Sequence, residues 1–164
     1  MVRKQGYLLV VLICAIVNGQ AQTFGINQLI SLSGKALGDQ YILKERKSDN
    51  GKTYTTIHAE LSNPSHTIMF TVITNIAGDT KLGSHQLQEL EAFTYKDRNA
   101  IFGTIIPFIG VLQVELIGCN AVLALNETVA PDEIATKDNL LKQLEMFDIL
   151  GLEKLLSDEN KGNN

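Results

Sequence analysis

Apolar and polar residues alternate with a period of two between Asp39 and Ile76, a pattern typical of half-buried β-strands. Asn50-Gly51 interrupts the alternation and favours a tight hairpin turn, because both residues tolerate positive φ. We expect this turn to pair Asp49 with Lys52 and, further along, Ile42 with Ala59. The next turn, Asn63 to His66, would then place Ser62 opposite Thr67 and Ile57 opposite Val72.

The two turns together predict a three-stranded meander with one consistently apolar face. That face would carry Ile42, Ile57, Ala59, Leu61, Ile68, Phe70 and Val72. The opposite face would carry Tyr41, Leu43, Tyr54, Thr56, His58, Glu60, Met69, Thr71 and Ile73. This second face is too apolar to be fully wetted, so we expect another element or a ligand to cover part of it.

Other segments show the period of a helix. Ile26 to Leu37 is predicted as a helix that stops at Gly38, and Ser84 to Phe93 as a short helix after a serine cap. Asp138 to Leu156 is predicted as an amphipathic C-terminal helix that breaks or bends at Gly151. Three apolar residues fall outside the main apolar arc of that helix and suggest a surface for a ligand or partner: Met146, Ile149 and Leu150.

Ala100 to Leu125 is the most hydrophobic stretch after the first 21 residues, and two interpretations remain open. A membrane-inserting segment would make the protein lytic or pore-forming. Core strands are favoured because Pro107 interrupts the run and because Val111 to Ile117 alternates. A hairpin through Gly118-Cys119, or one residue later, would unite Leu112, Val114, Leu116, Leu123 and Leu125 on one face.

The predicted fold is therefore α+β, with an antiparallel sheet of five to seven strands covered by an N-terminal and a C-terminal helix. The alternative is a closed β-barrel with a C-terminal helix.

The first residues predict an exported protein. Arg3 and Lys4 precede an uninterrupted apolar run from Tyr7 to Val17, and small residues follow at Gly19 and Ala21. The run is long enough for only about half of a ~30 Å hydrocarbon core. We therefore expect a signal peptide over 1–21, a single globular domain over 22–156 and a flexible polar tail over 157–164.

Composition removes several classes of function. The formal net charge is −4, so the chain offers no basic surface for nucleic acid. After cleavage Cys119 would be the only cysteine, which rules out an intrachain disulfide. A thiol at or beside a hairpin tip would be accessible, so a Cys119-linked homodimer is one candidate assembly.

Asn126-Glu127-Thr128 is the one acceptor sequon for a glycan in a secreted protein, because Pro64 disqualifies the other.

No motif predicts catalysis or a cofactor. The histidines His58, His66 and His85 lack the spacing of a zinc site, and no phosphate-binding glycine loop or nucleophile elbow is present. The sequence thus favours a secreted, non-enzymatic binding protein for a small hydrophobic ligand or an extracellular protein. The small ligand would lie between the sheet and the C-terminal helix, and the candidate surface residues are Tyr41, Met69, Met146, Ile149 and Leu150. A membrane-active protein and a small enzyme using the histidines or Cys119 are the alternatives.

Overall fold

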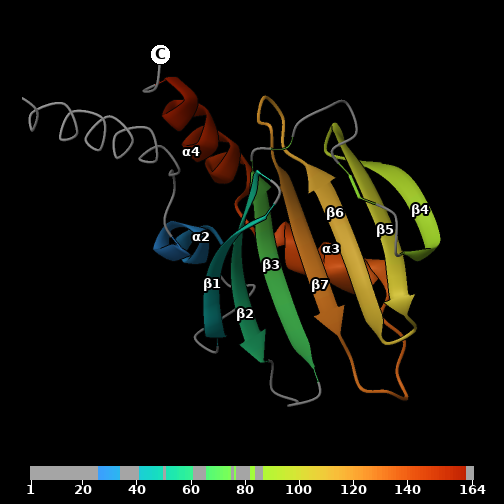
Figure 1. Ribbon diagram of the computed structural model, residues 1–164. Coiled ribbons are helices and arrows are strands. Elements are labelled where there is room, and N and C mark those ends of the chain that lie inside the picture. The colour runs from blue at the N-terminus through green and yellow to red at the C-terminus, as the bar shows by residue number, and fades with distance from the viewer. Residues whose placement is uncertain are drawn as a thin grey trace, which may run out of the picture.

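The chain forms one open antiparallel sheet of seven strands (Figure 1). The computed structural model describes residues 26–33, 41–49, 51–60, 66–74, 76, 82–83 and 87–161. The strands are β1 (Tyr41–Asp49), β2 (Lys52–Glu60), β3 (Thr67–Thr74), β4 (Gln88–Tyr95), β5 (Arg98–Ile106), β6 (Ile109–Glu115) and β7 (Val122–Thr128). Their order across the sheet is β1-β2-β3-β7-β6-β5-β4.

Three helices are described: α2 (Ile26–Ser33), α3 (Lys137–Glu145) and α4 (Ile149–Lys161). Leu29, Leu140 and Leu152, one from each helix, are fully buried in the same core as one face of the sheet. α3 lies behind the sheet in Figure 1. The helices therefore cover one face of the sheet, and we call the other one the open face.

The predicted α+β class is confirmed, at the upper end of the expected strand number. The alternative of a closed barrel is wrong, because β1 and β4 lie at opposite ends of the strand order and do not pair. The predicted signal peptide over 1–21 lies outside the described residues. α4 continues to Lys161, so the first part of the predicted tail is helical.

The first hairpin has the predicted register near its turn, where Asp49 pairs with Lys52 and Gly51 adopts a φ of 78°. Further along, an irregularity between Tyr41 and Leu43 shifts the pairing, so that Tyr41 rather than Ile42 lies opposite Ala59.

The second hairpin differs from its predicted register by two residues. Glu60, and not Ser62, pairs with Thr67, and Ile57 pairs with Phe70 instead of Val72. A slip by two leaves every side chain on the same face. The predicted apolar face is accordingly correct where it is described: Ile57, Ile68, Phe70 and Val72 are all fully buried.

The predicted helix over 84–93 is wrong, because Gln88–Tyr95 forms the edge strand β4. An irregularity in the pairing between Gln88 and Glu91, with Glu89 at a φ of 48°, places apolar residues at a helix-like spacing in a strand. The pairing of this segment with β5 stabilises the strand more than a helical pattern of only three apolar residues could stabilise a helix.

The hydrophobic stretch from Ala100 to Leu125 forms most of β5, β6 and β7, and these strands join the rest of the sheet. Glu115 pairs with Val122, the register predicted for a hairpin through Gly118-Cys119. β7 then pairs with β3 on its other side, so the strand latest in the chain lies at the centre of the sheet.

The C-terminal helix is interrupted, but before Gly151. α3 ends at Glu145, and α4 begins at Ile149. Gly151 lies in the first turn of α4, where its N–H donates to the Asp148 carboxylate at 2.9 Å. A Cβ at Gly151 would overlap that carboxylate and approach Leu32 Cδ2 to 2.8 Å. The glycine thus permits the cap and the close approach of α2.

Candidate functional site

The open face of the sheet contains a groove of about 390 Å³ that crosses five strands. Its floor is a row of register partners, Glu45–Thr56–Thr71–Ala124–Gln113, taken from β1, β2, β3, β7 and β6. One flanking row contains Lys47, Tyr54 and Ile73, and the other contains Met69, Asn126 and Val111.

The sizes of these side chains explain the groove. The centre of the floor consists of two threonines and Ala124, whereas larger side chains such as Tyr54 and Met69 stand on either side. Successive side chains of a strand point to opposite faces, so the short residues lie in line across the sheet and leave a trough above them. The described residues that line the groove all come from these five strands.

Three polar side chains of the groove are already hydrogen-bonded. The hydroxyls of Thr56 and Thr71 lie 3.0 Å apart across the strand pair. The Gln113 amide is bound at both ends by Gly83, whose N–H donates to Oε1 at 2.9 Å and whose carbonyl accepts from Nε2 at 3.1 Å. These two hydrogen bonds with Gln113 hold residues 82–83 at one end of the groove.

Asn126 is different. Its side chain lines the groove and is half-buried, and its amide has no hydrogen-bond partner among the residues that the structure describes. A half-buried amide without a partner has both a donor and an acceptor to offer to a bound molecule.

The described residues that line the groove have little net charge. Glu45 and Lys47 are the charged residues among them, and they carry opposite charges on the same strand. Among these described residues, none offers a counter-charge to a charged molecule bound over Thr71 and Ala124, and burial of an uncompensated charge is costly.

Two residues that the sequence singled out for different reasons meet in this groove. Met69, predicted as part of a binding surface, is the register partner of Asn126, the predicted glycosylation site. The side chain of Tyr41 lies outside the described part of the structure. The sequence missed the groove as a whole because three of its strands come from β1–β3 and two come from the segment after residue 108.

A second surface surrounds the junction of α3 and α4. Leu150 is 71% exposed, Ile117 51% and Met146 41%. Ile117 and Leu150 line an opening of about 520 Å³ together with Phe147. The predicted surface residue Ile149 is buried and belongs to the core under α4, and it also lines this opening.

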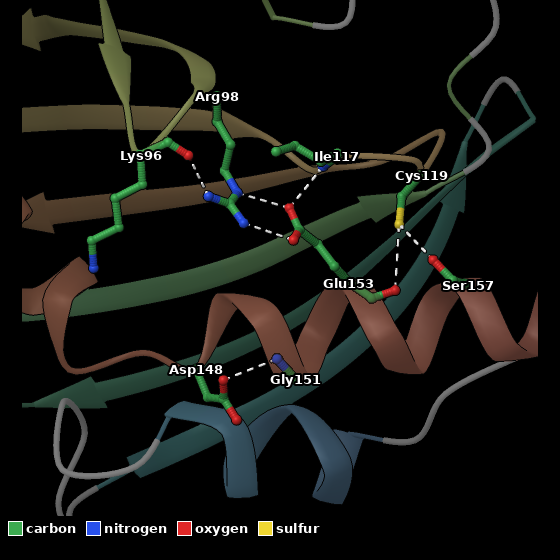
Figure 2. Close-up of polar contacts among 8 residues, drawn as sticks. All are labelled: Lys96, Arg98, Ile117, Cys119, Asp148, Gly151, Glu153 and Ser157. Atoms are coloured by element: carbon green, nitrogen blue, oxygen red, sulfur yellow. Dashed lines mark hydrogen bonds and ion pairs between the residues drawn. The ribbon is translucent and has the colours of Figure 1, made fainter.

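Beside this surface, a buried ion pair joins α4 to two turns of the sheet (Figure 2). Arg98 donates two hydrogen bonds of 2.7 Å to the Glu153 carboxylate, and Oε1 of Glu153 also accepts the Ile117 N–H. The hydrogen bond to Glu153 raises the pKa of Arg98, although burial acts in the opposite direction. Arg98 also donates to the Lys96 carbonyl at 2.6 Å and so holds the β4–β5 turn, where Lys96 and Asp97 both have positive φ.

Cys119 lies under α4 and is 2% exposed, with Sγ 3.6 Å from the Glu153 carbonyl oxygen and 3.7 Å from the Ser157 hydroxyl (Figure 2). The expectation of an accessible thiol at the hairpin tip is wrong, because α4 packs over that tip. A Cys119-linked dimer would require this part of α4 to move away.

A buried carboxylate lies under the helices at the other end of the sheet. Glu127 is fully buried, and its Oε1 lies 2.7 Å from His66 Nε2. Its Oε2 has no partner among the described residues. The sequence did not suggest this pair, since 61 positions separate the two residues and only the pairing of β3 with β7 brings them together.

The described residues contain no group of three potential metal ligands. In that same part of the chain, no helix is both long and apolar enough to span a membrane. Comparisons of the chain with protein-family models, with curated proteins and with solved structures gave no match.

Proposed function

We propose that the chain is a secreted, non-enzymatic binding protein that holds a small, partly apolar molecule in the groove on the open face of its sheet. The observation that carries the proposal is the groove itself, with short side chains along its floor and larger ones on both sides. Its volume lies within the range of about 300–1,000 Å³ typical of small-molecule sites.

The open face supports this function better than the space between the sheet and the C-terminal helices. The helix side contains closely packed core side chains, such as the stacked rings of Phe70 and Phe147, whose centroids are 5.3 Å apart. In the groove, Tyr54, Met69, Ile73 and Val111 offer apolar contacts beside a few polar groups. Export remains a prediction of the first 21 residues.

Filling the groove tests the proposal. Ala124 is 5% exposed at the centre of the floor, and Ala124→Phe would place a ring where the ligand lies. Ala92→Phe is the matched control, because Ala92 is an exposed residue of β4 that does not line the groove. We expect native mass spectrometry of the protein from a eukaryotic host to show a bound small molecule on the wild type and on Ala92→Phe.

Ala124→Phe should lack that added mass while keeping the circular dichroism spectrum of the wild type. Equal retention of the molecule by both variants would place its site elsewhere. A wild type that binds no small molecule, either as purified or after incubation with a lipid extract, would refute the proposal.

The exposed apolar residues at the α3–α4 junction favour a second candidate function, the binding of another protein. A second copy of the chain is the partner that can be tested directly. If Leu150 is central to such contacts, Leu150→Glu should convert a dimer into a monomer in sedimentation experiments. A wild type that stays monomeric at about 100 µM would exclude self-association through this surface.

A further inference from the structure

We infer that the groove selects a neutral amphipathic molecule and that Asn126, when it carries no glycan, is the residue that recognises its polar group. The expected ligand carries one hydroxyl or carbonyl group on an apolar skeleton. This inference rests on the proposed function and adds to it the chemistry of the ligand and the residue that determines specificity.

The state of the two side-chain amides in the groove leads to Asn126. Gly83 occupies both ends of the Gln113 amide, and the two threonine hydroxyls bind each other. The amide of Asn126 has no such partner within the described structure. A hydroxyl group can donate to its carbonyl and accept from its amino group, whereas a plain hydrocarbon would leave both unsatisfied.

The position of Asn126 suits this role. It lies on the central strand β7 between Met69 of β3 and Val111 of β6, so the amide has an apolar side chain on each side. A ligand with its polar group at Asn126 could lay its apolar skeleton over Met69 or Val111 and across Ala124. The contacts would combine one oriented hydrogen bond with apolar burial, as small-molecule sites commonly do.

The charges favour a neutral ligand. Lys47 could attract a carboxylate, but Glu45 on the same strand opposes it, and both residues lie in the β1 part of the groove. Asn126 lies on β7, with β2 and β3 between it and β1. Among the described side chains that line the groove, none would give an anionic group at Asn126 a counter-ion in place of the water that it loses.

Three probes with one chain length test the inference: dodecan-1-ol, dodecanoate and dodecane. Each would displace the neutral fluorophore N-phenyl-1-naphthylamine from protein made in a bacterial host, where the sequon stays unmodified. We expect the alcohol to compete about tenfold better than the other two, since one satisfied hydrogen bond corresponds to about that factor in affinity.

Two variants identify the residue. Asn126→Leu keeps the size of the side chain, removes the amide and should abolish the preference for the alcohol. Thr128→Ala is the matched control: it destroys the same sequon, but it retains Asn126, and Thr128 does not line the groove. It should behave like the wild type.

The outcomes separate the two proposals. If the fluorophore binds and Ala124→Phe abolishes its binding, but the three probes compete equally or dodecanoate competes best, the groove is a binding site and the neutral-ligand inference is wrong. If Asn126→Leu retains the preference, recognition by Asn126 is wrong. If neither the fluorophore nor any probe binds the wild type, the proposed function fails as well.

Discussion

The two faces of the sheet are built from the same strands but are filled in different ways. On the helix-covered face, long apolar side chains such as Phe70, Leu112 and Leu123 are fully buried against α3 and α4. On the open face, neighbours of these residues in the sequence, Met69, Gln113 and Ala124, line a groove. Alternation along each strand thus separates a packed core from a surface with room for a ligand.

The open face is also partly closed by the chain itself. Gly83 binds the Gln113 amide, and a Cβ at Gly103 would lie 2.9 Å from both the Gln88 carbonyl oxygen and Leu87 Cβ. Gly83, Leu87 and Gln88 therefore lie close to β5 and β6. Helices thus bury one face of the sheet, whereas these residues and the groove share the other.

The largest expected difference between the faces concerns two adjacent residues of β3. Phe70→Ala removes a fully buried ring that stacks on Phe147 and should lower the free energy of unfolding by about 3–5 kcal/mol. Met69→Ala, on the groove side, should cost about 1 kcal/mol or less, because Met69 is only half-buried. Urea unfolding followed by circular dichroism measures both, and equal losses would contradict the distinction between the faces.

The next largest effect concerns the ion pair under α4. Glu153→Gln leaves the buried guanidinium of Arg98 without its counter-ion and should cost about 3 kcal/mol. The double variant Arg98→Met with Glu153→Met should recover part of that loss, because no unpaired charge remains. Thermal unfolding of the three proteins tests this, and a double variant less stable than Glu153→Gln would show that the pair itself supplies the stability.

The stability that this ion pair provides should not fall at moderately high pH, because Arg98 stays protonated there. The hydrogen bond to Glu153 raises the pKa of Arg98 above its ordinary value. Stability gained from a raised pKa is present at lower pH and is lost only as pH rises through the folded-state value. Unfolding curves between pH 7 and pH 10 should therefore show no loss that depends on Arg98, as judged against the Arg98→Met and Glu153→Met double variant.

A smaller effect is expected where the chain closes on the open face. Gly103→Ala would press a methyl group against the Gln88 backbone and should cost about 1–3 kcal/mol through overpacking. Gly83→Ala is the control, since the nearest atoms to a Cβ there are 3.9 Å away, an ordinary contact. If the two variants unfold at the same denaturant concentration, the segment before β4 does not pack on β5 as described.

The smallest effect concerns the buried carboxylate of Glu127. His66→Ala removes the partner of Oε1 and should cost about 1–3 kcal/mol, toward the lower end because His66 is 27% exposed and water can partly replace it. Replacing Glu127 by Gln in that background should restore stability, since an uncharged amide costs less to bury. Chemical denaturation of the single and double variants provides the comparison.

Prediction from sequence succeeded best where a pattern and a turn agreed. Asn50-Gly51 placed Asp49 opposite Lys52, and the pairing of Glu115 with Val122 is one of the two registers that the sequence left open for the hairpin at Gly118-Cys119. It failed at Ser84 to Phe93, where three apolar residues suited a helix and an irregular edge strand equally well. It also placed the helix break at Gly151, because a glycine inside a helical pattern looks like a break even when it serves a cap.

The sequence by itself determined which side chains share a face, because the period of a strand is a local property that survives even a slip of two residues. Only the tertiary structure decided which faces meet. The insertion of β7 between β3 and β6 brought Asn126 beside Met69 and Glu127 beside His66, and the packing of α4 buried Cys119. Contacts between residues far apart in the chain depend on the order of the strands, and no local pattern encodes that order.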